Sequence, residues 1–156
     1  MKCRLLAAGT RLPEWVNTGF QEYQKRLRAP LVLELEEIPV AARRAGENPG
    51  RAVAREGQRM LASISPKDYV VALEIAGTAM STEKLSSWLG ERLRDGKPLA
   101  FLIGGPDGLA PDCLKRADRS WSLSPLTLPH ALVRVVVAEQ IYRAMSLTAG
   151  HPYHRA

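Results

Sequence analysis

Three segments of this 156-residue chain hold residue types suited to binding a ligand or moving a proton. The first, residues 104–108 (GGPDG), follows an apolar run. Glycines at the end of a strand adopt positive φ and let backbone approach a ligand closely. The spacing matches neither the dinucleotide-binding fingerprint G-x-G-x-x-G nor a phosphate-binding P-loop. A ligand-binding turn and an ordinary tight turn before a helix both fit these residues.

The second segment, residues 122–130 (SLSPLTLPH), is apolar yet irregular, since its prolines prevent regular strand pairing. Exposed loops are rarely so apolar, so we expect it to be tucked into the body or against a ligand. Its backbone N–H and C=O groups then need partners, and the hydrogen-bonding edge of a flat adenine ring would supply them. A buried structural loop fits the same residues.

The third segment is the C-terminal stretch His151, Tyr153, His154 and Arg155, where chains usually carry small polar residues. No nearby Asp, Glu or Cys completes a metal site with the two histidines, so we expect no metal. Arginine binds phosphate or stacks on bases, and histidine shuttles protons. We therefore expect RNA contact or catalysis here, with a structural role as the alternative.

Charge and cysteine content narrow the class of protein. Twenty-two basic against sixteen acidic residues give a net charge of +6, which favours a polyanionic partner. Cys3 and Cys113 are too few for a disulfide framework or a zinc cage. No apolar run is long enough for a signal peptide or a membrane span, so we expect a cytoplasmic protein with no membrane partner.

Residues 43–59 contain several arginines that could bind phosphates or form a solvated surface. They are Arg43, Arg44, Arg51, Arg55 and Arg59.

Apolar periodicity predicts the elements that position these segments, within a single domain over residues 1–156. We expect strands at 3–8, 31–38, 69–75, 99–103 and 120–123. We expect helices at 14–28, 51–64, 82–95, 111–117 and 131–148, the third capped by Ser81 and ended by Gly96. The alternation predicts a three-layer α/β/α fold with a mostly parallel sheet, whose ligands bind beyond the carboxyl ends of the strands. Gly77 and the first two segments above follow such strand ends.

The last helix is apolar around most of its circumference, Val136 and Ile141 included. Such a helix must be buried on more than one side, which a small chain alone hardly achieves, so we expect a subunit interface. Glu139 and Arg143 on this helix are spaced for an i, i+4 salt bridge.

Together, these segments resemble one family over essentially the whole chain. The strings are LIGGPDG at 102–108, SWSLSPLTLPH at 120–130 and HPYHR at 151–155, preceded by LAAGT at 6–10 and PEWV at 13–16. They resemble the SPOUT-class methyltransferases that methylate N3 of a pseudouridine in large-subunit ribosomal RNA. One departure is Ala131, where we expect a helix-starting proline in many members.

The resemblance implies a C-terminal trefoil knot, a homodimer and S-adenosylmethionine as methyl donor. It places the donor against three loops, at Leu73, Gly104, Leu123, Ser124, Pro125, Leu126, Thr127 and Leu128. The N3 proton must leave during transfer, which requires a base or a stabilising charge. Our candidates for catalysis are Tyr153, His154, Arg155 and Arg143, and the sequence leaves the identity of the base open.

Two alternatives to this function stay open. The chain could be a SPOUT methyltransferase for another RNA, or a ribosome-associated RNA-binding factor without catalysis. A Rossmann dehydrogenase is disfavoured, because the glycine fingerprint of that fold is absent.

Overall fold

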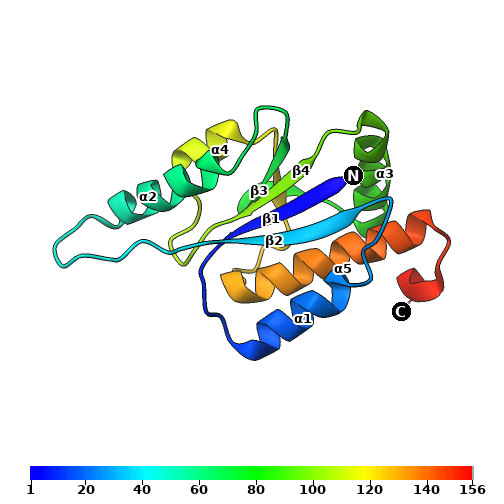
Figure 1. Ribbon diagram of the computed structural model, residues 1–156, viewed down its shortest axis with the longest axis horizontal. Helices are drawn as coiled ribbons and strands as arrows, with labels where there is room; N and C mark the ends of the chain where they lie inside the picture. The colour runs from blue at the N-terminus through cyan, green and yellow to red at the C-terminus, as the bar shows by residue number, and fades with distance from the viewer. Residues whose placement is uncertain (156) are drawn as a thin grey trace.

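Five parallel strands form one sheet at the centre of the computed structural model, which describes residues 1–155 (Figure 1). Their order across the sheet is β2-β1-β4-β3-β5. The strands are β1 (Lys2–Ala8), β2 (Val32–Ile38), β3 (Tyr69–Ala79), β4 (Leu99–Ile103) and β5 (Arg119–Ser122). The helices are α1 (Glu14–Gln24), α2 (Pro49–Ala62), α3 (Thr82–Asp95), α4 (Pro111–Arg116) and α5 (His130–Thr148), followed by a 3-10 helix (Pro152–Arg155).

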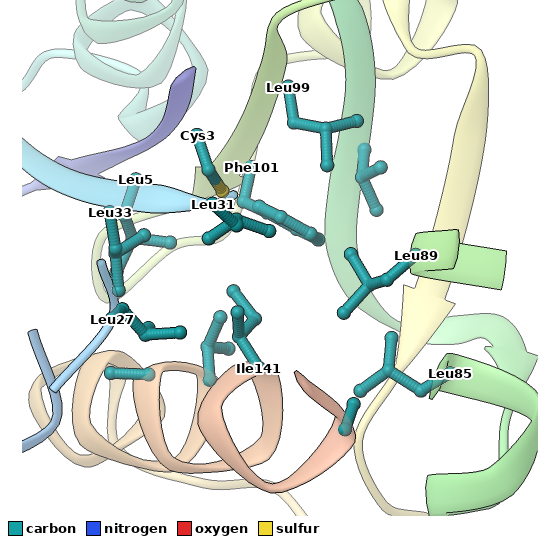
Figure 2. Packing of buried hydrophobic residues seen from close by; sticks show 14 of the residues in the cluster. Cys3, Leu5, Leu27, Leu31, Leu33, Leu85, Leu89, Leu99, Phe101 and Ile141 are labelled. Carbon is teal, nitrogen blue, oxygen red and sulfur yellow. The ribbon is translucent and has the colours of Figure 1, made fainter. Parts of the chain in front are cut away.

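Helices cover both faces of the sheet, which confirms the predicted three-layer α/β/α fold (Figure 1). On one side Leu5 and Phe101 pack with Ile141 of α5 and with residues of α1 and α3 (Figure 2). On the other, Leu6 and Leu102 pack against α2 and α4. Neighbouring residues of a strand point to opposite faces, so β1 and β4 must be apolar throughout when both faces are covered.

Helix ends follow local signals that the sequence carries. The Ser81 hydroxyl accepts a hydrogen bond from the Lys84 amide at 3.2 Å, and Gly96 ends α3 at φ +70°, both as predicted. Helix α2 begins two residues before the predicted start, because the Asn48 side chain caps it and Pro49 occupies its first turn. Helix α1 ends at Gln24, four residues earlier than predicted, and a tighter turn carries the chain on to Leu27.

Strand β3 is four residues longer than predicted, and its extension meets β5 a second time. Leu73 and Thr78 both pair with Trp121, so residues 74–77 form a bulge between the two pairings. Gly77 allows this close approach of the two strands, because a Cβ there would lie 2.8 Å from the backbone of Ser120 and Trp121. The predicted trefoil knot stays a prediction.

Candidate functional site

A cavity of about 880 Å³ lies at the carboxyl ends of β3, β4 and β5. Its wall is formed by residues 73–76, by the glycine turn and the residues beside it, and by the segment that joins β5 to α5. This volume lies in the range of small-molecule sites, and the edge of the sheet is the one where such folds bind ligands.

Seven of the eight residues predicted to bind the donor lie on the cavity wall. They are Leu73, Gly104, Leu123, Ser124, Leu126, Thr127 and Leu128. Pro125 is exposed and is not part of that wall. Sequence reasoning missed further wall residues, among them Glu74, Trp121 and His130. Each lies within two residues of a predicted position, so the strand ends could have suggested them.

The glycine turn 104–108 forms the part of the wall that follows β4. A Cβ on Gly104 would lie 2.4 Å from the carbonyl carbon of Gly108 and 2.6 Å from the Leu109 amide nitrogen. Gly108 has φ +81°, and its amide donates to the carbonyl of Gly105 at 3.0 Å. Gly104 is therefore required by the turn folding onto itself. The sequence left open whether this is a tight turn or a ligand-binding turn. The structure shows a tight turn that also lines the cavity.

The apolar segment after β5 is only partly buried and lines the cavity, so the alternative of a fully buried structural loop is wrong. Leu126 is 70% exposed, and Pro125 and Thr127 are exposed as well. The Ser124 hydroxyl holds the bend, accepting a hydrogen bond from the Leu126 amide at 3.0 Å. The segment forms a thin wall between cavity and solvent, so its apolar side chains are available to a ligand or a partner.

A wholly buried arginine fixes the start of α5 beside the cavity. Arg134 donates from Nη2 to the carbonyls of Ala8 at 3.1 Å and Gly9 at 2.7 Å, and pairs from Nη1 with Glu37 at 2.9 Å. Burial lowers the pKa of Arg134, and the ion pair with Glu37 offsets part of that effect. One turn earlier on α5, His130 faces Gly9: a Cβ there would lie 3.6 Å from His130 Nε2.

Three of the four residues predicted for catalysis follow the C-terminal end of α5, and Arg143 lies in its last two turns. The cavity borders His130 and Val133 at the start of the same helix, and Figure 1 shows the C-terminus beyond its other end. A 19-residue helix is about 27 Å long at about 1.5 Å per residue. Residues 151–155, here called the tail, therefore do not reach the cavity of their own chain. The structure joins Tyr153 and Arg143 through Glu139, with the Tyr153 hydroxyl 3.2 Å and Arg143 Nη2 2.6 Å from the same carboxylate oxygen.

The tail packs as a small aromatic cluster around this carboxylate. The Arg143 guanidinium lies 4.9 Å from the centre of the Tyr153 ring, and the Tyr142 ring centre lies 4.7 Å away. Burial raises the pKa of Tyr153, and so does its hydrogen bond with Tyr23. His154 Nδ1 donates to the His151 carbonyl at 2.5 Å, and Arg155 is exposed. The predicted Glu139–Arg143 salt bridge is confirmed.

The apolar surface of α5 is largely covered by its own chain. Ile141 is fully buried between the sheet and α3, whereas Val136 is half-buried. The expectation that a partner subunit covers all the excess apolar surface is wrong for Ile141, because α1 and α3 flank the helix.

Of the five arginines that could bind phosphates, two form ion pairs within the chain and a third donates to a backbone carbonyl. Arg43 pairs with Glu56 and Asp107, Arg55 with Glu47, and Arg59 donates to the Pro39 carbonyl. Within residues 1–155, no cluster of three His, Cys, Asp or Glu side chains could hold a metal ion. In the same part of the chain, no helix is both long and apolar enough to cross a membrane.

Comparison with known proteins identifies the family. The family model described as "Predicted SPOUT methyltransferase" matches residues 1–154. The chain is 54% identical to Ribosomal RNA large subunit methyltransferase H of Alkalilimnicola ehrlichii and 53% identical to the protein of that name from Xanthomonas axonopodis pv. citri, over the full length of each pair. The chain belongs to the SPOUT methyltransferase family. The motifs at 102–108, 120–130 and 151–155 had predicted this membership.

Two solved structures share the fold of this SPOUT methyltransferase at low sequence identity. A methylase family protein from Neisseria gonorrhoeae is 14% identical, with a TM-score of 0.54, and the match covers 90% of this chain and 81% of that one. A methyltransferase from Bordetella pertussis Tohama I is 16% identical, with a TM-score of 0.56, covering 92% and 95%. These likenesses concern the fold alone.

Proposed function

We propose that this SPOUT methyltransferase transfers a methyl group from S-adenosylmethionine to N3 of a pseudouridine in large-subunit ribosomal RNA. The observation that carries the proposal is the full-length identity of 52–54% with proteins named Ribosomal RNA large subunit methyltransferase H. The net charge of +6 suits a polyanionic substrate. Because ribosomal RNA is made and assembled in the cytoplasm of bacteria, we place the protein there.

The donor would occupy the cavity beside β3, β4 and β5. Its lining of Leu, Ile and Trp side chains suits a flat adenine ring, and the glycine turn offers bare backbone for hydrogen bonds. The Glu74 carboxylate on the wall suits the cationic groups of the donor. Bound there, S-adenosylmethionine supplies an already activated methyl group. The wall residues orient the donor and exclude water from the reacting atoms.

Catalysis by the tail then requires a second copy of the chain. Because α5 separates the tail from the cavity of its own chain, Tyr153, His154 and Arg155 act in the cavity of a partner, with Arg143 supporting Tyr153. Exposed apolar side chains support such a homodimer: Trp15 is 59% exposed and Ile75 is 54% exposed, on α1 and beside the cavity. Aromatic side chains such as Trp15 are enriched in the interfaces between protein chains.

Lysine at Val136 tests the homodimer. Val136→Lys places a charge on the half-buried face of α5, so we expect a folded monomer with an intact donor cavity. Ile141→Lys should instead unfold the chain, since it buries a charge in the core at a cost of several kcal/mol. Sedimentation velocity at micromolar concentration measures the change.

Glu91→Lys, which adds the same side chain on the exposed face of α3, is the control and should remain dimeric. A wild-type chain that sediments as a monomer, or a Val136→Lys variant that stays dimeric and folded, would contradict this interface.

Calorimetry with S-adenosylmethionine separates a methyltransferase from an RNA-binding factor. We expect saturable heat, with about one donor bound per cavity. A folded dimer that releases no heat of binding would refute the proposed function and favour a binding factor without catalysis.

A further inference from the structure

His130 lies on the cavity wall, while the other two histidines of the chain lie in the tail. It opens α5, directly after the apolar segment that forms the thin side of the cavity. Within residues 1–155 no side chain or backbone group forms a hydrogen bond with its ring, so a ring nitrogen is available to a bound base. Among the side chains on this wall, only the imidazole is an uncharged base that can accept a proton near neutral pH.

The surroundings of His130 hold its position and favour its neutral form. Gly9 of the β1–α1 loop has φ +115°, and its missing side chain leaves room for the ring. Arg134 lies one turn along α5, and Glu37 of β2 pairs with that arginine. Glu74 is the charged group on the β3 part of the wall. Partial burial lowers the pKa of His130, and the nearby Arg134 cation lowers it further.

We propose that His130 is the residue that accepts the N3 proton, in the cavity of its own chain. The inference rests on the proposed function and names the group that performs its proton transfer. The N3–H bond breaks and its proton passes to the unprotonated ring nitrogen of His130. The N3 electron pair forms a bond to the methyl carbon, and the carbon–sulfur bond breaks with its electrons left on sulfur. The imidazolium then releases its proton to water, which the neighbouring Arg134 cation favours.

The tail suits a complementary role in this scheme. His154 already donates from Nδ1 to the His151 carbonyl, and Arg155 contributes a guanidinium group with several hydrogen-bond donors. A tail from the partner would therefore supply contacts and positive charge to the RNA base, while the first residue of α5 moves the proton. Arg134 is a positioning residue, because it holds the start of α5 to the end of β1.

Single-turnover methylation across pH tests the role of His130. For the wild type we expect a rate that rises with pH and then levels off, with a midpoint below that of an ordinary histidine, because burial and Arg134 lower the pKa of His130. His130→Ala should lose about 100- to 1,000-fold in rate together with that pH step, while donor affinity and dimer stay intact. Added imidazole should restore part of the rate, since the substitution leaves space for it. Glu91→Gln, which changes an exposed titratable side chain of α3 outside the cavity, should keep the wild-type rate and pH profile.

The outcomes separate this inference from the function on which it rests. A wild-type protein that methylates no pseudouridine would remove the proposed function itself. An active wild type with a His130→Ala variant of unchanged rate and pH profile would overturn the role of His130 alone. A variant that loses donor binding, or whose rate imidazole fails to raise, would make His130 a structural residue and also overturn it.

Discussion

Removal of residues 153–156 is expected to abolish methyl transfer while fold, dimer and donor binding stay nearly intact. None of the described residues of this tail lines the cavity, so donor affinity should not depend on them. Their contacts are local: Tyr153 lies against Tyr142 and Arg143 and donates to Glu139. Losing that hydrogen bond costs about 1 kcal/mol of stability. Single-turnover methylation, calorimetry and thermal unfolding measure the three quantities separately.

Point variants divide the contribution of the tail. Tyr153→Phe is a matched control for the ring, since it keeps the aromatic contacts and removes only the hydroxyl bonded to Glu139. Arg155→Ala should weaken RNA binding or transition-state stabilisation equally at every pH. His154→Asn should lower turnover. Because His130 is the proposed base, the methylation rate of this variant should still rise with pH as it does in the wild type. A shifted step in His154→Asn would make His154 the base.

Two results would contradict this role of the tail. A deletion that methylates at the wild-type rate removes the tail from the active site. A deletion that no longer binds donor makes the tail a lid over the cofactor of the partner's cavity.

Gly104→Val is expected to weaken donor binding by at least about 100-fold, with the dimer retained. The reason lies in the turn itself: a Cβ would fall 2.4 Å from the carbonyl carbon of Gly108, so residues 104–108 must move. They form one wall of the cavity, and their movement displaces the backbone that faces the ligand. Titration calorimetry with S-adenosylmethionine gives the affinity.

Gly90→Val is the matched control for this substitution. Gly90 lies in α3, where a Cβ meets nothing within 4 Å, so this variant should bind donor as the wild type does. If Gly104→Val folds, dimerises and still binds donor with unchanged affinity, the donor does not lie against this turn.

Local sequence patterns predicted the sheet and the loops at the strand ends that border the cavity. The apolar run of β4 marked a strand covered on both faces, and Ser81 and Gly96 marked the ends of α3. Because ligands bind at strand ends in parallel sheets, the sequence pattern placed residues 104–108 and the segment after β5 at a ligand site, whereas Leu73 was named from the family resemblance.

Contacts between distant segments were beyond the sequence patterns. In the sequence, Arg134 is simply a polar residue on an apolar helix. In the structure it donates hydrogen bonds to the carbonyls of Ala8 and Gly9, more than a hundred residues away. A Cβ on Gly57 would lie 2.4 Å from that of Ala110, which shows how closely α2 approaches the start of α4. Neither contact leaves a trace in periodicity or spacing, since each depends on how the elements pack.

The tail shows the same limit for the candidate site. In the sequence the tail follows the donor loop by a single helix, and the prediction was that in a dimer it reaches a site built partly by the other subunit. The helix is rigid and about 27 Å long, so the tail and the loop lie at its two ends. In the proposed dimer a second copy of the chain brings them together, and local patterns do not specify where that copy docks.

Transfer of a labelled methyl group to purified large ribosomal subunits tests the central claim most directly. The wild-type protein, labelled S-adenosylmethionine and subunits that carry their pseudouridines are combined, and the modified nucleoside is identified by mass spectrometry. Subunits from cells unable to make pseudouridine serve as the matched substrate. We expect about one methyl group per subunit, on N3 of a pseudouridine, and none on the matched substrate. Equal labelling of both substrates, or no labelling of either by a dimer that binds donor, would contradict the proposed function.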